Sequence, residues 1–198
     1  MRFVLATTNP HKVREIRTLL EGLDVEILGL DALPPIEAPA ETGASFAENA
    51  ALKARYYAGR TGLPAIAEDS GLEIDALGGA PGVESARFHG EDSTYPEKFA
   101  AIYAMLDSNG GRDSTARFVC AVAVADESGV LFETRGTVEG RISPEPRGSH
   151  GFGYDPIFFY PPEGRTLGEV TDEVKRAVSH RGAAFRTLRR WLQSTPNA

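Results

Sequence analysis

Short apolar runs alternate with segments of helical periodicity in the first part of the chain. Residues 2–6 (RFVLA), which are apolar from Phe3 to Ala6, predict a short buried strand. Asn9 then stands at a helix N-cap position and Pro10 at the first helical position, and apolar residues recur at helical spacing as far as Gly22. The run VEIL, residues 25–28, predicts a second strand. This alternation favours an α/β fold.

The next segment combines a loop with the start of a helix. Residues 31–44 are rich in Pro, Ala and Gly, which predicts a loop. Ser45 and Glu48 have the spacing of a capping box, in which each side chain accepts a hydrogen bond from the backbone of the other residue. We therefore expect a helix over residues 46–59.

Two further apolar runs are separated by the polar tetrapeptide EDSG, residues 68–71. Runs this short, with turn-forming residues between them, are typical of strands joined by a turn. We interpret residues 63–67 and 72–77 as two short strands, and the tetrapeptide as a tight turn between them.

The second half of the chain predicts longer strands and two more helices. A helix is expected over residues 95–106, and the apolar segment 116–126 is the clearest strand in the sequence. Residues 128–129 (SG) start a hairpin into residues 130–140, and a last helix is expected over residues 180–193. Together with the alternation near the N-terminus, this meander indicates an α/β fold with a mixed, curved sheet.

The composition is that of an ordinary globular protein of 198 residues, with 41% apolar and 25% charged residues. This length suits a single domain covering residues 1–198. The net charge of −7 disfavours non-specific nucleic-acid binding, and no apolar stretch approaches the roughly 18 residues of a membrane span. Cys120 is the one cysteine, which excludes an intrachain disulfide. We expect a cytoplasmic protein without a nucleic-acid or membrane partner.

Several common catalytic motifs are absent from the sequence. There is no Gly-x-x-x-x-Gly-Lys-Ser/Thr phosphate loop and no Gly-x-Ser-x-Gly nucleophile motif. The segment GFGYDP has Pro156 where a dinucleotide-binding motif would have its third glycine. The four histidines lack the spacing of zinc ligands.

Three acids and a lysine form a candidate metal and phosphate site. Glu68 and Asp69 are adjacent carboxylates, and Mg²⁺ binds one or two carboxylates while substrate phosphates and water complete its shell. Glu41 is a candidate second carboxylate, and Lys53, on the helix expected over residues 46–59, would bind phosphate as a point charge. From the residues alone, the acids also fit a surface turn and an exposed loop, and the lysine a solvated helix face.

Two segments in the last quarter of the chain are candidates for ligand recognition. Ser179 can cap the last helix, which would place His180 and Arg181 in its first turn, where the helix dipole disfavours cations. Such an exception to a local rule points to function. In FGYDP, Phe152 beside a glycine suits stacking on a nucleobase, although the same segment fits a turn that leads into a buried strand.

Five segments together resemble one known family. TTNPHK, ETGASFAENAALKA, AIAEDSGLEIDALGGAPGVESARF, GFGYDPIFF and SHRGAAF occur in the order and spacing of the noncanonical purine nucleoside triphosphate pyrophosphatases, also called dITP/XTP or inosine triphosphate pyrophosphatases. The resemblance covers nearly the whole chain. It implies a two-lobed α/β fold whose long curved sheet is flanked by helices, with the active site between the lobes. It also implies a Mg²⁺-dependent homodimer that hydrolyses ITP, dITP and XTP to the monophosphate and pyrophosphate.

The same resemblance assigns roles to individual residues. Glu41 and Asp69 would hold Mg²⁺, and Asp69 would also be the base that activates water. Lys53 is a second catalytic candidate from its residue chemistry, because it would add positive charge for the phosphates. Substrate-binding residues are expected at Thr7, Thr8, Asn9, Pro10, His11, Lys12, Ser70, Phe152, Gly153, Tyr154, Asp155, Lys175, His180 and Arg181. The family often has two aspartates at positions 68 and 69, so Glu68 departs from its pattern. Glu68 is a further candidate metal ligand, either direct or through water.

A mechanistic hypothesis combines these roles with the chemistry of the residues. Backbone N–H groups at the start of the first helix, with Lys12 and the hydroxyls of Thr7 and Thr8, would hold the triphosphate. Donors from His180 and Arg181 would pair with O6 of hypoxanthine or xanthine and stay unpaired against adenine. We expect Arg181→Ala to lose activity on ITP with little change in the fold. Two alternatives stay open, a phosphatase that releases the γ-phosphate and a nucleotide-binding sensor without turnover.

Overall fold

The computed structural model describes residues 2–195, which divide into two compact units. Unit 1 contains the chain up to Asp69, the segment Cys120–Gly136 and the chain from His180 onwards. Unit 2 contains Ser70–Val119 and Thr137–Ser179.

The strands form one mixed sheet in the order β2-β1-β3-β4-β5-β6-β7. β1 pairs in parallel with β2 and β3, whereas β6 pairs antiparallel with β5 and β7. This arrangement confirms the α/β class and the mixed sheet. The strands are β1 (Arg2–Leu5), β2 (Glu26–Gly29), β3 (Ala65–Ile74), β4 (Thr115–Asp126), β5 (Gly129–Ile142), β6 (Phe158–Tyr160) and β7 (Arg165–Thr166).

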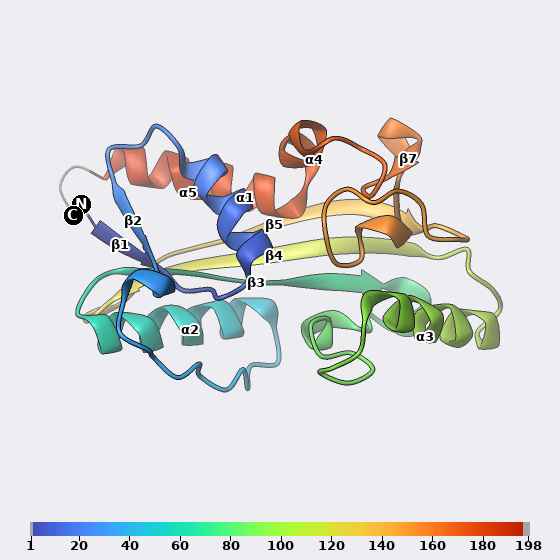
Figure 1. The fold of residues 1–198 in the computed structure, drawn as a ribbon, viewed down its shortest axis with the longest axis horizontal. Helices are drawn as coiled ribbons and strands as arrows, with labels where there is room; N and C mark the ends of the chain where they lie inside the picture. The colour runs from blue at the N-terminus through green and yellow to red at the C-terminus, as the bar shows by residue number, and fades with distance from the viewer. Residues whose placement is uncertain (1, 196–198) are drawn as a thin grey trace. The chain divides into compact units, whose positions relative to one another are not determined.

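Helices cover both faces of the strands in unit 1. α1 and α5 lie on one face and α2 lies on the other (Figure 1). None of the helices in residues 2–195 has the length and apolarity that crossing a membrane requires. The helices are α1 (Pro10–Leu20), α2 (Phe46–Thr61), α3 (Tyr95–Ser108), α4 (Asp172–Val178) and α5 (His180–Ser194).

α1 begins as its capping sequence predicts. Asn9 has extended backbone angles, and its side-chain oxygen accepts hydrogen bonds from the N–H groups of His11 at 3.0 Å and Lys12 at 3.3 Å. The apolar side of α1 then packs with α5 on β1, β3 and β4. The fully buried members of this core include Phe3, Leu5, Ile16, Ile66, Cys120, Val124, Phe185 and Leu188.

α2 has a strong N-cap but not the complete capping box. Ser45 Oγ accepts a hydrogen bond from the Glu48 N–H at 3.2 Å, as predicted. The Glu48 carboxylate reaches one residue further back than expected and accepts from the Ala44 N–H at 2.7 Å. The helix continues to Thr61 and ends at Gly62, whose φ of +65° is the left-handed conformation that glycine adopts easily.

The EDSG segment is not a turn, and this interpretation of the sequence is wrong. β3 is a single strand from Ala65 to Ile74, and the tetrapeptide lies in its middle. Gly71, which suggested a turn, instead permits a close approach within unit 2. A Cβ atom there would lie 2.7 Å from the Gly82 carbonyl oxygen and would also collide with Ser85. β3 lies between β1 and β4 in the sheet, and its pairing with β1 is at Ala65 and Ile66, before the polar residues.

Unit 2 has its own core. α3 contributes a buried apolar side, and strand residues and the segment around β6 complete the cluster. The members with no exposed surface are Leu72, Ile74, Ile102, Leu106, Ala116, Ile157, Phe158 and Leu167. This core holds the segment 151–158, which contains the glycine-rich loop singled out in the sequence.

Candidate active site

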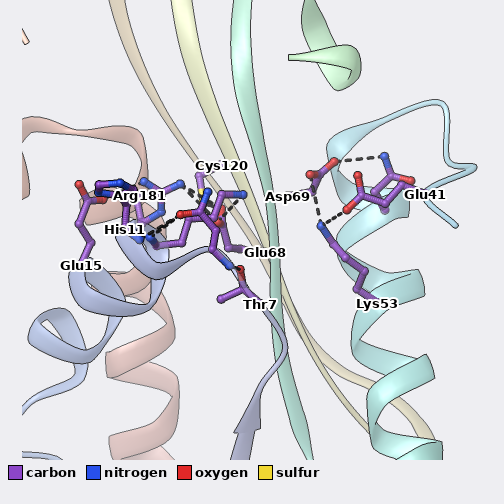
Figure 2. A network of polar contacts seen from close by, with 12 residues as sticks. Thr7, His11, Glu15, Glu41, Lys53, Glu68, Asp69, Cys120 and Arg181 are labelled. Atoms are coloured by element: carbon purple, nitrogen blue, oxygen red, sulfur yellow. Dashed lines mark hydrogen bonds and ion pairs between the residues drawn. The ribbon is translucent and has the colours of Figure 1, made fainter. Parts of the chain in front are cut away.

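β3 directs the two adjacent acids of EDSG to opposite faces. Successive side chains of a strand point to alternate sides of the sheet. Figure 2 shows Asp69 on the side of Lys53 and Glu41, and Glu68 on the side of Arg181 and Cys120. The structure therefore brings Asp69 together with Glu41 and Lys53, and does not bring Glu68 to them.

Lys53 links the two carboxylates on the α2 side of β3. Its Nζ lies 2.6 Å from Glu41 Oε1 and 3.3 Å from Asp69 Oδ1. Lys53 is 9% exposed and Asp69 is 6% exposed, so this contact is largely shielded from solvent. α2 positions the lysine because Asn49, Lys53 and Tyr57 recur every four residues along its buried side.

Asn49 belongs to this site, although the sequence analysis did not select it. Its Nδ2 donates to Asp69 Oδ2 at 3.1 Å, and it has no exposed surface. The sequence feature that could have indicated Asn49 is its spacing of four residues from Lys53 on the same helix.

Burial and charge set the ionisation of the site. Burial raises the pKa of the Asp69 carboxyl above its usual value, and the neighbouring Glu41 raises it further, although Lys53 and the Asn49 hydrogen bond oppose them. Burial alone would lower the pKa of the Lys53 ammonium, but Asp69 and Glu41 outweigh it and raise that pKa. A carboxylate with a raised pKa beside a charged lysine is suited to accepting a proton from water.

The site offers fewer protein ligands than a self-contained metal centre. Within residues 2–195, no group of three or more His, Cys, Asp or Glu side chains is placed to hold a metal ion. Glu41 and Asp69 nevertheless share one cation, the Lys53 ammonium, so a positive charge fits between their oxygens. Two carboxylates suit Mg²⁺ when phosphate oxygens and water supply its other ligands. The pair therefore fits a metal that is bound together with a phosphate substrate.

On the opposite face, Glu68 is the centre of a buried ionic cluster. Its carboxylate lies 2.8 Å from Lys12 Nζ and 3.3 Å from Arg181 Nη2, and it accepts a hydrogen bond from Cys120 Sγ at 3.2 Å. Arg181 also pairs with Glu15 at 2.8 Å. Burial would raise the pKa of Glu68, but Arg181 and Lys12 hold it well below its usual value. Glu68 thus connects α1, which carries Lys12, to α5, which carries Arg181.

The loop before α1 presents polar groups at a helix N-terminus. Asn9 caps the helix, and the Asn9 N–H donates to Thr7 Oγ1 at 3.3 Å. Thr8 and His11 are exposed, and Lys12 retains 18% of its side-chain surface. N-terminal N–H groups and the helix dipole favour bound anions. A phosphate group is one anion that such a helix N-terminus can bind.

A cavity of about 750 Å³ borders this loop. Thr7 and Thr8 line it together with Arg14 and Arg17 of α1, two residues that the sequence analysis did not select. The arginines add positive charge beside the threonine hydroxyls, and Asp31 in the same lining offsets part of it.

In unit 2, Asp155 organises the glycine-rich loop. Its Oδ2 accepts from Lys175 Nζ at 2.6 Å and from the Phe152 N–H at 2.7 Å. The Lys175 ammonium lies 4.5 Å from the centre of the Phe152 ring. Gly151 has a φ of +70°, and a Cβ atom at this position would collide with the Asp155 carboxylate. Asp155 and Lys175 are 2% and 3% exposed, so the pair is a rigid buried support for Phe152.

The remaining predicted residues divide between the two units. Tyr154 is buried and donates from its hydroxyl to the Ser85 carbonyl at 2.8 Å, and Gly153 precedes it with a φ of +70°. Ser70 is the first residue of unit 2 on β3 and is half-buried. His180 and Arg181 begin α5 in unit 1, and both are buried.

The class of protein follows from comparison with known families. Residues 3–191 match the model of the Ham1 family, and the chain belongs to that family. This confirms the resemblance found in the sequence.

Individual relatives match along almost their full length. The chain is 48% identical over 195 residues to a dITP/XTP pyrophosphatase of Frankia alni, and 46% identical over 188 residues to one of an Exiguobacterium species. Each match covers 95% of both chains. Among solved structures, a HAM1 protein from Coxiella burnetii superposes with a TM-score of 0.90 at 41% identity, over 98% of this chain and 100% of that one.

Proposed function

We propose that this protein hydrolyses noncanonical purine nucleoside triphosphates, namely ITP, dITP and XTP, to the nucleoside monophosphate and pyrophosphate. The observation that carries the proposal is the Asp69–Lys53–Glu41 arrangement in a chain whose full-length relatives are named dITP/XTP pyrophosphatases. This hydrolysis would remove noncanonical nucleotides from the nucleotide pool before a polymerase could use them.

Asp69 is the proposed base. A water molecule that it activates attacks the α-phosphorus, and pyrophosphate leaves. The raised pKa of Asp69 supports this role because a more basic carboxylate accepts a proton more readily. Mg²⁺, held by Glu41 and Asp69, would neutralise and orient the phosphates when bound. Lys53 is the proposed partner of the phosphates once a metal takes its place between the carboxylates, because two cations at one site repel each other.

The triphosphate is proposed to lie at the N-terminus of α1. Lys12 and the hydroxyls of Thr7 and Thr8 provide donors there, and Glu68 fixes the position of Lys12 through its ion pair. In this proposal Glu68 supports the phosphate-binding loop and is not a ligand of the metal, because its carboxylate is used by Lys12, Arg181 and Cys120.

The purine is proposed to be recognised by stacking and by hydrogen-bond donors. Phe152 would stack on the ring, and the Asp155–Lys175 pair would hold Phe152 in place. His180 and Arg181 would donate to the O6 atom that hypoxanthine and xanthine carry and adenine lacks, and for Arg181 this requires that the base replace part of its pairing with Glu15 or Glu68. A site that pairs with one group rejects an analogue lacking it because its buried donors are left unpaired. The family resemblance also supports a cytoplasmic homodimer, which size-exclusion chromatography with light scattering would test.

Turnover assays test the function directly. ITP, dITP, XTP, ATP and GTP are incubated with the purified protein, with and without Mg²⁺, and the products are resolved into pyrophosphate and phosphate. We expect pyrophosphate from ITP, dITP and XTP only when Mg²⁺ is present. We expect little product from ATP and GTP. Phosphate as the main product would instead identify a phosphatase that cleaves at the γ position. Tight nucleotide binding without any product would identify a sensor.

A further inference from the structure

We propose that Asn49 is a positioning residue for the reaction, which holds Asp69 and the loop that carries Glu41 in a fixed relation. This inference rests on the proposed function, in which Asp69 and Glu41 act on the same substrate. Asn49 touches neither the substrate nor the reacting water in this proposal, and it acts through Asp69.

The amide of Asn49 makes one contact with each of the two segments. Its Nδ2 donates to Asp69 Oδ2 on β3 at 3.1 Å. Its Oδ1 accepts from the backbone N–H of Gly43 at 2.8 Å, two residues after Glu41. Asn49 has no exposed surface and its contact with Asp69 is buried, whereas Gly43 is partly exposed. One buried side chain therefore joins the strand of the proposed base to the loop of the second carboxylate.

The chemistry of the partners fixes which way the amide faces. A backbone N–H can only donate, so it must meet the amide oxygen, and this leaves the amide nitrogen for the Asp69 carboxylate, which accepts when ionised. Aspartate at this position would keep the acceptor and lose the donor. Leucine, of similar shape, would lose both. Asparagine satisfies both partners at once.

The Gly43 contact is closely packed as well as hydrogen-bonded. A Cβ atom on Gly43 would lie 2.7 Å from Asn49 Oδ1, 2.8 Å from Glu48 Cβ and 2.9 Å from the Asn49 backbone nitrogen. A methyl group there would push the loop away from the first turn of α2. Other contacts also join this loop to α2. Lys53 pairs with Glu41, the Tyr56 hydroxyl donates to the Glu37 carbonyl at 2.9 Å, and the exposed Ala44 N–H donates to Glu48 Oε2. The Asn49 amide differs from these contacts because the same side chain also holds Asp69 through a neutral hydrogen bond.

Asn49 and Lys53 hold different oxygens of Asp69. Lys53 is close to Oδ1 and Asn49 to Oδ2. A divalent cation shared by Asp69 and Glu41 would repel the Lys53 ammonium but not a neutral amide. The Asn49 contact can therefore persist in both states, and it keeps Oδ1 turned to the side of Glu41. We infer that Asn49 sets the geometry of the catalytic carboxylate, so that its loss lowers kcat and leaves nucleotide affinity nearly intact.

Three variants test the contact. N49D replaces the donor to Asp69 with a second carboxylate, N49L removes both hydrogen bonds of the amide, and G43A disturbs the loop from the other side. We expect N49D to lower kcat for dITP by about 100-fold and G43A by about 10-fold, with KM changed less than about threefold in each. Because N49L already lacks the Gly43 contact, the double variant N49L/G43A is expected to lose little beyond N49L alone. A kcat within threefold of wild type for N49D, or losses that multiply in the double variant, would overturn the inference.

S45A is the matched control. It removes the N-cap of α2, four residues before Asn49, without touching either amide contact. We expect S45A to unfold at lower urea concentration and to keep kcat within about twofold. A kcat loss in S45A as large as in N49D would show that any weakening of the helix start is sufficient, and would overturn the positioning role.

Hydrogen exchange tests the contact without relying on turnover. The backbone amide of Gly43 is expected to exchange at least about 10-fold faster in N49L than in the wild type, and at a similar rate in S45A. Unchanged exchange in N49L would refute the loop contact. If the wild type shows no turnover of any nucleotide, the proposed function fails, while the exchange rates still decide whether Asn49 holds the loop.

Discussion

The carboxylates of Glu68 and Asp69, neighbours in the sequence, belong to two different networks because β3 directs them to opposite faces (Figure 2). Glu68 pairs with Lys12 and Arg181 and has a pKa well below its usual value, whereas burial raises the pKa of Asp69. One strand therefore supports a charged structural contact on one side and a proton acceptor on the other. We therefore expect substitutions of the two acids to have different effects.

Asp69→Asn is expected to abolish turnover without unfolding the protein. Asparagine keeps the shape of the side chain and can still contact Asn49 and Lys53, but it cannot accept a proton from water. General-base catalysis contributes about 10²–10⁴-fold, so we expect kcat for dITP to fall by about 10³-fold or more. Glu73→Gln, further along β3, is the control and should keep its activity. An Asp69→Asn enzyme with more than a tenth of the wild-type kcat would exclude Asp69 as the base.

Glu68→Gln is expected to destabilise the fold. It leaves Lys12 and Arg181 beside a neutral group in a buried cluster, and breaking a buried ion pair typically costs about 3–5 kcal/mol. Urea unfolding near neutral pH measures the loss of unfolding free energy. A loss below about 1 kcal/mol would show that water or another acid compensates the two cations.

The same variant has a characteristic pH dependence. The folded-state pKa of Glu68 lies well below the unfolded value of about 4.5, so its stabilising effect is complete above that pH and is lost as the pH falls through the folded-state pKa. Below about pH 4.5 the difference in unfolding free energy between the wild type and Glu68→Gln should shrink by about 1.4 kcal/mol for each pH unit. A constant difference between the two proteins across this range would contradict an ionised Glu68.

Local chemistry made parts of this fold predictable. Asn9 and Pro10 fix the start of α1 because a cap depends only on neighbouring residues. The EDSG segment was misread because β3 is an inner strand of the sheet, between β1 and β4, and no local pattern reveals a strand's place in a sheet. A strand also alternates its side chains, so the misreading hid the separation of Glu68 from Asp69.

Long-range contacts explain what the sequence could not show about the site. Family resemblance and residue chemistry indicated Glu41, Lys53 and Asp69, but Asn49 depends on partners 6 and 20 residues away in the chain. Arg181 is a further case. It was expected to tolerate alanine with little change in the fold, yet it is 2% exposed and pairs with Glu15 and Glu68. We now expect Arg181→Ala to lose stability as well as activity.

Cys120 is expected to resist alkylation in the folded protein. It has no exposed surface, and burial together with the adjacent Glu68 carboxylate holds its thiol pKa well above the usual value. The thiolate is the reactive form, so iodoacetamide should leave the native protein unmodified and should modify it fully in denaturing urea. Mass spectrometry measures the modified fraction of Cys120 in the native and in the denatured protein. Rapid modification of native protein would show that the Glu68 cluster opens on the timescale of the reaction.

Lys175→Met tests the support of Phe152. Methionine removes the charge that pairs with Asp155, and the loop that carries Phe152 depends on that carboxylate. We expect KM for dITP to rise at least about 10-fold with a smaller change in kcat, and stability to fall by about 3 kcal/mol because Asp155 is left as an unpaired buried charge. Glu173→Gln, exposed on the same helix, is the control.

A second substitution separates the two effects of Lys175→Met. Adding Asp155→Asn removes the unpaired charge, and replacing both ions of a buried pair with neutral groups is often close to neutral for stability. The double variant should therefore recover most of the unfolding free energy. Its KM for dITP should stay high, because the amide of asparagine holds the Phe152 N–H less strongly than a carboxylate does. If KM recovered together with stability, the Asp155 carboxylate would not be needed to hold Phe152, and the high KM of Lys175→Met would come from the loss of stability alone.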